Sequence, residues 1–185
     1  MTTIAIIGAG PLGRWLALAA ARAGYRVFLE DVMPSNLHHA QEYLRQQLSA
    51  EALAGEPAPV QVHFVSTVED AVREADLAID CVPDELESKL EILWLLDRMA
   101  PPRTVLATPT TNLSIDDLAS CTYRPEKCIA IAASPRNLSN ERPGSAIGLI
   151  PTARTAPEAL ALVRTFWERL GFDTQLSGLA DSQPR

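Results

Sequence analysis

The feature that most constrains the fold is a glycine-rich turn near the N-terminus. It reads Gly8-Ala9-Gly10-Pro11-Leu12-Gly13 and directly follows the apolar run Ile4–Ile7. A continuous apolar run of this length is typical of a strand that is buried on both faces of a parallel sheet. After the turn, apolar residues recur at helical spacing until Gly24, a residue type that often ends a helix. The sequence therefore predicts a strand, a tight turn and a helix in immediate succession.

The same alternation continues along the chain. Further strands are predicted over residues 27–29, 60–65, 77–79, 104–107, 129–132, 146–150 and 172–176, and further helices over 34–53, 68–74, 85–99 and 157–170. Short apolar strands that alternate with helices predict a parallel sheet covered on both faces. We therefore expect a Rossmann-type α/β domain, doubly wound and mainly parallel, over residues 1–180, and a flexible tail over 181–185.

In this context the glycine-rich turn predicts a dinucleotide site, because it joins a strand to a helix. Gly8 permits the tight turn, Gly10 lets the backbone approach the diphosphate, and Gly13 lets the helix pack closely on the strand. Pro11 and Leu12 open the helix, where the missing N–H of proline is tolerated. The free N–H groups of the first helical turn would then bind the phosphates.

Asp31 follows the second predicted strand, 18 residues after Gly13. A carboxylate at this place can accept hydrogen bonds from the hydroxyls of the adenosine ribose. The following residues, 32–35, include no Arg or Lys that would bind a 2′-phosphate, so NAD is favoured over NADP. The neighbouring acid, Glu30, is expected to point away because side chains alternate along a strand.

Composition excludes several function classes. The net charge is −7 and Lys and Arg do not cluster, which argues against nucleic acid or an anionic membrane as partner. The longest apolar stretches are about eight residues, shorter than a membrane-spanning helix. No basic patch precedes an apolar segment at the N-terminus, so no signal peptide is expected. Three cysteines without Cys-x-x-Cys spacing suit a reducing cytoplasm and predict no metal site.

Six segments together carry a more specific pattern than the glycine turn alone: residues 6–14, 23–31, 75–84, 86–89, 106–115 and 124–126. With them the chain resembles the N-terminal, NAD-binding domain of the L-3-hydroxyacyl-CoA dehydrogenases over nearly its whole length. The resemblance implies an oxidoreductase of fatty acid metabolism, with NAD as cofactor and an acyl-CoA as substrate.

The resemblance also implies individual cofactor contacts. It places a cofactor-binding loop at Val82, Pro83 and Asp84, and Asp84 and Lys89 match positions that touch the nicotinamide half. Thr111 falls where the family has a Ser near the nicotinamide and the substrate. From the residues alone, Lys89 is equally well a solvated lysine on a helix, and Thr111 a loop hydroxyl that bonds its own backbone.

The catalytic pair of the family is missing. The family has a His that acts as general acid/base, and its position here is Ala132. The Glu that orients this His falls near Gly148. Thr111, Ser134 and Asn137 remain as candidates to polarise a substrate carbonyl, although none of them titrates near neutral pH. The helical C-terminal domain of the family would begin where this sequence stops.

Three hypotheses follow from these departures. The first is an NAD(H)-binding protein without dehydrogenase activity of its own. The second is an NAD-dependent oxidoreductase for a 3-hydroxyacyl-CoA-like or other small hydroxy or keto substrate, with a proton donor other than His. The third is a site completed by a partner subunit, a homo-oligomer or a longer natural chain. His38, His39 and His63 lie on other predicted elements and do not replace the missing base.

One aromatic residue also departs from the family. Trp15 stands where the family usually has a small residue. It is interpreted either as part of the core or a surface groove, or as a new contact surface.

Overall fold

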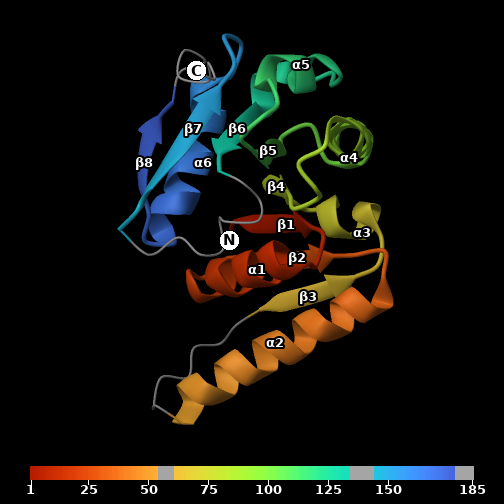
Figure 1. Cartoon of the computed structure of the whole chain (residues 1–185), viewed down its shortest axis with the longest axis vertical. Coiled ribbons are helices and arrows are strands. Elements are labelled where there is room, and N and C mark those ends of the chain that lie inside the picture. The colour runs from red at the N-terminus through yellow and green to blue at the C-terminus, as the bar shows by residue number, and fades with distance from the viewer. Residues whose placement is uncertain (54–60, 134–143, 178–185) are drawn as a thin grey trace.

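The computed structural model describes residues 1–53, 61–133 and 144–177, and these form one eight-stranded sheet (Figure 1). The strands are β1 (Thr3–Ile7), β2 (Arg26–Glu30), β3 (Val62–Val65), β4 (Leu77–Asp80), β5 (Val105–Thr110), β6 (Cys128–Ala132), β7 (Ala146–Pro151) and β8 (Asp173–Leu176). All eight lie where the sequence predicts strands, with ends that shift by at most three residues. The boundary predicted at residue 180 lies outside the described residues.

The strand order is β3-β2-β1-β4-β5-β6-β7-β8. Strands β1 to β6 are parallel, β7 runs antiparallel to β6, and β8 is parallel to β7. This confirms the prediction of a Rossmann-type, mainly parallel sheet. Because the chain order reverses between β1 and β4, a ligand crevice is expected where the carboxyl ends of these strands diverge.

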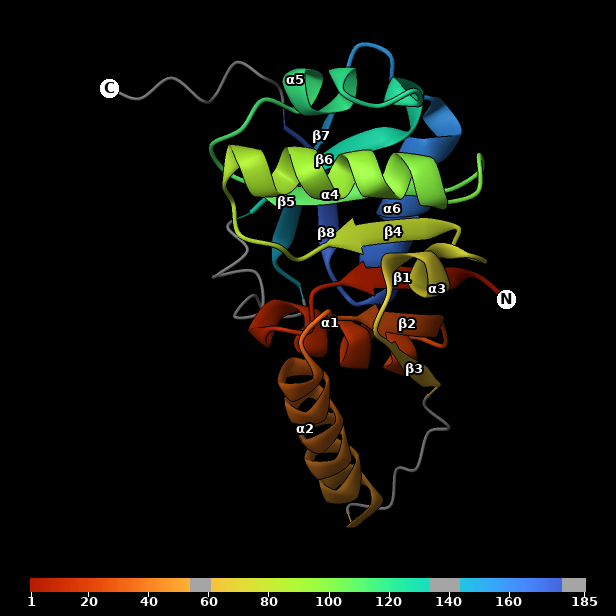
Figure 2. The same ribbon diagram turned by 90° about the vertical axis from the view of Figure 1, so that its right-hand side faces the viewer.

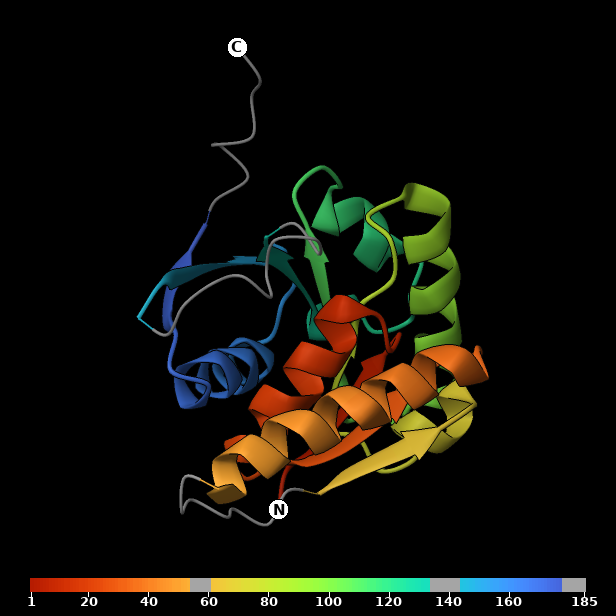
Figure 3. The same ribbon diagram turned by 60° about the horizontal axis from the view of Figure 1, so that its bottom comes forward.

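Helices cover both faces of the sheet (Figure 3). One face carries α1 (Pro11–Arg22), α2 (Pro34–Leu53) and α6 (Pro157–Arg169), and the other carries α3 (Val68–Val72), α4 (Leu86–Met99) and α5 (Ile115–Ser120). Figure 2 shows that α2 extends well beyond the sheet. None of the described helices combines the length and the apolar character that crossing a bilayer requires.

An aromatic cluster joins α1 and α6 on the first face. Phe166 and Trp167 of α6 are fully buried, and Phe172 lies edge-on to Trp167 at a ring separation of 5.6 Å. Trp15 contacts the same Phe172 at 6.2 Å and packs against this core. Of the two interpretations of Trp15, the structure therefore supports the packing role.

Two short elements are not predicted from the sequence, namely α5 and the 3-10 helix η1 (Pro125–Lys127). The start of α5 does carry a local signal, because the Ser114 side chain accepts a hydrogen bond from the backbone N–H of Asp117. Ser followed three residues later by an acid is a recognised N-terminal helix pattern. The helix has only six residues, too few for its apolar spacing to show.

Lys89 does not lie in solvent. Its side chain is fully buried in α4, and its Nζ atom lies 2.5 Å from Oδ1 of Asp80, which is fully buried at the end of β4. Burial raises the pKa of the Asp80 carboxyl group, and the nearby ammonium group of Lys89 opposes that rise. The interpretation of Lys89 as a solvated helix lysine is therefore wrong, and the ion pair ties α4 to the centre of the sheet.

Removing the cation should destabilise the fold. We expect Lys89→Met to lower the free energy of unfolding by about 3–5 kcal/mol, because it leaves a buried carboxyl group without its partner. The control is Arg73→Met, which breaks an exposed ion pair with Asp70. The Arg73 side chain is 66% exposed and the Asp70 side chain is 48% exposed. Its expected effect is below about 1 kcal/mol. Urea denaturation measures both, and equal losses would contradict the assignment.

Candidate functional site

A large cleft opens at the carboxyl ends of β1, β2, β4 and β5, where the strand order reverses. Its volume is about 1400 Å³. It continues between α3 and α4 on one face of the sheet. The cleft is lined by Ile7, Gly8, Gly10, Pro11, Leu12, Glu30, Asp31, Val32, Asn36, Ser66, Thr67, Val68, Glu69, Cys81, Val82, Pro83, Asp84, Glu85, Ser88, Glu91, Ile92, Leu95, Met99, Thr111 and Asn112.

Helix α1 begins at this cleft with its N–H groups uncapped. Gly10 is the N-cap residue, Pro11 is the first helical residue, and the first turn has neither a side-chain cap nor an acidic residue. The positive end of the helix and its free N–H groups therefore face the cleft, which is the usual arrangement for binding a phosphate. Gly8 enters the turn with φ of +103°, a conformation that favours glycine.

The two later glycines of the turn have different surroundings. A Cβ atom on Gly13 would lie 1.7 Å from the carbonyl oxygen of Gly8, so this position is closed to any side chain. A Cβ atom on Gly10 would have no heavy atom within 4 Å. Gly10 therefore borders open space in the cleft, whereas Gly13 serves the packing of helix on strand and does not line the cleft.

Asp31 lies against the glycine-rich turn. Its Oδ2 atom accepts hydrogen bonds from the backbone N–H of Ala9 at 2.8 Å and from the amide of Asn36 at 3.0 Å, and its Oδ1 atom accepts one from Met33 N at 2.8 Å. A carboxylate offers about four acceptor sites, so three bonds fix its orientation and leave capacity for a ligand hydroxyl. The adenosine-ribose role of Asp31 stays a prediction.

Glu30 does not point away from the site, so this expectation is wrong. The residue is only 6% exposed and lines the cleft beside Asp31. Glu30 is in register with Ile7 on the sheet face that carries α3 and α4, and the cleft continues onto this face, so a side chain there also lines it. Burial, with a smaller contribution from the charge of Asp31, raises the pKa of Glu30 to about 7.

Asp84 and Thr111 meet across the far part of the cleft. The Oδ2 atom of Asp84 accepts a hydrogen bond from the backbone N–H of Thr111 at 3.1 Å, while its Oδ1 atom is buried without a partner. The hydroxyl that bonds the loop backbone belongs to Thr110, which accepts from Asn112 N and Leu113 N. The Thr111 hydroxyl makes no hydrogen bond within the described part of the chain and remains available to a ligand.

Most predicted cofactor contacts come together in this one cleft. Gly8, Gly10, Pro11, Leu12, Asp31, Val82, Pro83, Asp84 and Thr111 all line it, although their contact with a cofactor stays a prediction. Lys89 does not line it, because its ammonium group is bonded to Asp80. Ser134 and Asn137 lie outside the described residues.

Cys81 also lines the cleft and was not predicted there. It follows β4, and its backbone N–H donates to the carbonyl oxygen of Ile7 at 2.7 Å. Burial raises the pKa of the Cys81 thiol well above its ordinary value. A thiol held protonated is a poor nucleophile, so Cys81 contributes shape to the cleft and no reactive group.

The charges around the cleft are of one sign. Six lining residues are acidic, and no Lys, Arg or His belongs to the described lining. These acids are Glu30, Asp31, Glu69, Asp84, Glu85 and Glu91. A phosphate on the adenosine ribose would lie beside Asp31 and Glu30 without a cation to pair with, which supports the preference for NAD over NADP.

The two positions that the resemblance assigns to a catalytic His and Glu are neighbours in space. A Cβ atom on Gly148 would lie 2.9 Å from Cβ of Ala132, on adjoining strands β7 and β6. It would also lie 2.4 Å from Oγ of Ser177. The space where an acid would stand therefore holds the Ser177 side chain, and Ala132 beside it has no titratable group.

The three histidines lie elsewhere. His38 and His39 are exposed on α2, and His63 is exposed on the edge strand β3, where it stacks on Phe28 at 4.7 Å. Within the described residues, no three His, Cys, Asp or Glu side chains gather as a metal site would require.

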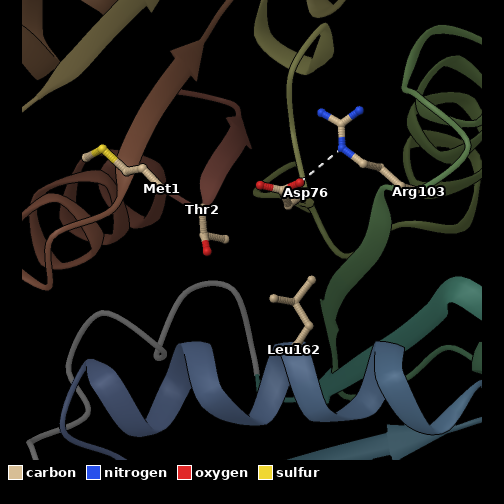
Figure 4. Close-up of a pocket in the computed structure, with 5 residues that line it drawn as sticks. All are labelled: Met1, Thr2, Asp76, Arg103 and Leu162. Carbon is tan, nitrogen blue, oxygen red and sulfur yellow. Dashed lines mark hydrogen bonds and ion pairs between the residues drawn. The ribbon is translucent and has the colours of Figure 1, made fainter.

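A second hollow lies at the other end of the strands, beside the residues that precede the amino-terminal ends of β1 and β4 (Figure 4). Its volume is about 410 Å³ and it is lined by Met1, Thr2, Asp76, Arg103 and Leu162. Asp76 accepts hydrogen bonds from Arg103 Nε at 3.0 Å and from Thr3 N at 2.9 Å. Both charged groups are thus already paired, which makes this hollow a poor ligand site.

Comparison with known proteins agrees with this geometry. The family model of the 3-hydroxyacyl-CoA dehydrogenase NAD-binding domain matches residues 3–174. The chain belongs to this family.

Three relatives show the range of proteins around it. The "Probable 3-hydroxybutyryl-CoA dehydrogenase" of Bacillus subtilis (strain 168) is 33% identical over 135 residues, 69% of this chain and 47% of the relative. The 5-formyl-3-hydroxy-2-methylpyridine 4-carboxylate 5-dehydrogenase of Mesorhizobium japonicum is 31% identical, over 91% of this chain and 54% of its own length. An L-carnitine dehydrogenase of a Pseudomonas species is 29% identical, over 91% of this chain and 52% of its own length. The chain spans about half the length of these curated relatives.

Solved structures agree on the fold. A structure of 5-formyl-3-hydroxy-2-methylpyridine 4-carboxylic acid 5-dehydrogenase, described as an NAD+-dependent dismutase, is 28% identical with a TM-score of 0.80, and covers 96% of this chain and 58% of that one. The structure of (S)-3-hydroxybutyryl-CoA dehydrogenase from Ralstonia eutropha matches with a TM-score of 0.82 at 20% identity. It covers 96% of this chain and 64% of that one. The second likeness concerns the fold alone.

The different surroundings of the two glycines lead to a paired prediction. We expect Gly13→Ala to lower the free energy of unfolding by about 3 kcal/mol or more, because its methyl group overlaps the Gly8 carbonyl. Gly10→Ala should change stability by less than about 1 kcal/mol but weaken NADH binding at least about tenfold, because its methyl group enters the space proposed for the diphosphate. Urea denaturation and NADH fluorescence measure the two effects. Equal stabilities of the two variants would contradict the packing role of Gly13.

The buried carboxyl group of Glu30 should make stability depend on pH. Its pKa is about 7 in the folded protein and near 4.5 in the unfolded chain, so folding favours the protonated form. The stability from this group is fully present below about pH 4.5 and is lost as the pH rises through about 7. We expect wild type to lose more stability than Glu30→Gln between about pH 5 and pH 8, measured by urea denaturation. Parallel profiles would show that Glu30 does not titrate in this way.

Proposed function

We propose that residues 1–180 form a cofactor domain that binds NAD(H) in the described cleft. The diphosphate would lie at the start of α1, the adenosine ribose at Asp31, and the nicotinamide toward Asp84 and Thr111. Three features fit this cofactor: the open space at Gly10, the uncapped N–H groups of α1, and the unpaired Oδ1 atom of Asp84. When bound, the nicotinamide supplies hydride transfer.

We further propose that the chain alone does not oxidise 3-hydroxyacyl-CoA thioesters. The observation that carries this proposal is the contact of Ala132, Gly148 and Ser177, which leaves no acid/base pair at the positions where the family has one. Loss of general acid/base assistance alone slows a reaction by about 10²–10⁴-fold. The three histidines lie on α2 and β3, where they cannot reach this place.

A second function is an NAD-dependent oxidoreductase acting on another small hydroxy or keto substrate. The free hydroxyl of Thr111 supports it, because this group lines the cleft near the buried Oδ1 atom of Asp84. A hydroxyl does not titrate near neutral pH, so it would orient a carbonyl while the proton comes from water or another subunit. A partner subunit, a second copy or a longer chain would complete this site, and we place the protein in the cytoplasm.

Two measurements on the purified chain test these functions. NADH fluorescence and thermal unfolding should report saturable binding, because a ligand that binds only the folded state raises stability. Addition of acetoacetyl-CoA should cause no appreciable oxidation of NADH.

Each result has its own meaning. Absence of binding and of stabilisation at millimolar NAD(H) would overturn the cofactor site. Appreciable turnover with acetoacetyl-CoA would overturn the proposed lack of activity while leaving the cofactor site intact. The matched control is Gly10→Ala, which should fold like the wild type and bind NADH weakly.

A further inference from the structure

Glu30 is a buried acid whose carboxyl group faces the cleft without a partner. The residue is 94% buried, yet it lines the cleft. Its backbone is held firmly, because its carbonyl oxygen accepts a hydrogen bond from Gly8 N at 2.8 Å and its strand pairs with both β1 and β3. Among the described residues, none donates a hydrogen bond to the side-chain carboxyl group. Neither oxygen of this carboxyl group is among the fully buried side-chain atoms that lack a partner, so the group is open to the cleft.

The surroundings of Glu30 are apolar on the sheet face that carries α3 and α4. Ile7 lies beside it on β1 in register, and the same cleft is walled by Val68 of α3 and by Ile92 and Leu95 of α4. These apolar side chains can cover the faces of a flat aromatic ring, and Glu30 places a carboxyl group beside them. Ligand pockets in proteins are usually lined by apolar side chains, with a few polar groups that fix the orientation of the ligand and provide specificity.

The neighbouring residues indicate which part of the cofactor reaches this place. Asp31, the proposed ribose contact, directly follows Glu30, so the base attached to that ribose would lie within a few ångströms of it. The cleft is also lined by Ser66 and Thr67, between β3 and α3, and by Glu69 of α3. The Glu30 carboxyl group therefore lies at the base end of the cleft and away from Asp84 and Thr111.

We propose that Glu30 recognises the adenine base of the cofactor by accepting a hydrogen bond from its 6-amino group. This inference rests on the proposed NAD site. The 6-amino group is the hydrogen-bond donor of adenine, and an ionised carboxylate is an acceptor only, so the two are complementary. A base that carries an oxygen at position 6 would present an acceptor to the same carboxylate. Glu30 thus makes the cleft selective for adenine over 6-oxo bases.

The experiment compares NADH with reduced nicotinamide hypoxanthine dinucleotide, which has an oxygen in place of the 6-amino group. Dissociation constants are measured by fluorescence at pH 8, where Glu30, with its pKa of about 7, is ionised. We expect wild type to bind NADH about tenfold more tightly than the hypoxanthine dinucleotide, the effect of one hydrogen bond to a charged group.

Two variants of Glu30 separate recognition from packing. Glu30→Gln should bind both dinucleotides with similar affinity, and should bind the hypoxanthine form more tightly than wild type does, because an amide can accept from a 6-amino group or donate to a 6-oxygen. Glu30→Val should also lose the preference, without gaining affinity for the hypoxanthine form. Glu87→Gln removes an exposed acid that does not line the cleft and should keep the wild-type ratio.

The outcomes are distinct for the two proposals. A wild type that binds both dinucleotides equally, or a Glu30→Val variant that keeps the wild-type ratio, would overturn the role of Glu30 while leaving the NAD site intact. Failure of wild type to bind either dinucleotide would overturn the NAD site and this inference together. Thermal unfolding of each variant verifies that a change in affinity does not come from loss of the fold.

Discussion

The contact between Gly13 and the carbonyl group of Gly8 is the constraint on which the cleft depends. It is so close that even a methyl group on Gly13 would overlap the Gly8 oxygen. The start of α1 is thereby held against the end of β1, and Gly8 and Ala9 are placed to donate to the Glu30 carbonyl and the Asp31 carboxylate. One backbone contact thus positions the proposed phosphate, ribose and base contacts relative to one another.

The fold was predictable because its signals are local. Apolar runs such as Ile4–Ile7 are buried on both faces of the sheet, and the glycine and proline residues between periodic segments coincide with the ends of the elements. The same reasoning fails for α5, whose six residues give little periodicity. The strand and helix ends differ from prediction where hydrogen bonding with a neighbouring strand, and not the residue type, decides them, as in the extension of β5 to Thr110.

The site was predictable only in part, because two of its features depend on contacts between distant segments. Lys89 lies in a helix between Glu87 and Glu91 and therefore looks like a solvated lysine, but its partner Asp80 lies on a strand nine residues earlier. Glu30 looks like the residue that alternation turns away from the ligand, yet the cleft extends onto the sheet face of α3 and α4, so both neighbouring acids reach it. Burial of a charge is a property of the assembled layers, and the pattern along one element does not reveal it.

The residues proposed to bind the cofactor and the two positions that the resemblance assigns to the catalytic pair lie on different strands, so one group can change while the other is retained. The cleft is built on β1, β2, β4 and β5, whereas Ala132 and Gly148 lie on β6 and β7. The Ser177 side chain, just beyond β8, lies within 2.4 Å of the Cβ that any other residue at position 148 would have. The backbone of Ser177 is held by its N–H bond to Leu149 at 2.9 Å. A side chain at position 148 would therefore require the Ser177 hydroxyl to turn away and Ala132 to shift, so the residues at positions 132, 148 and 177 depend on one another.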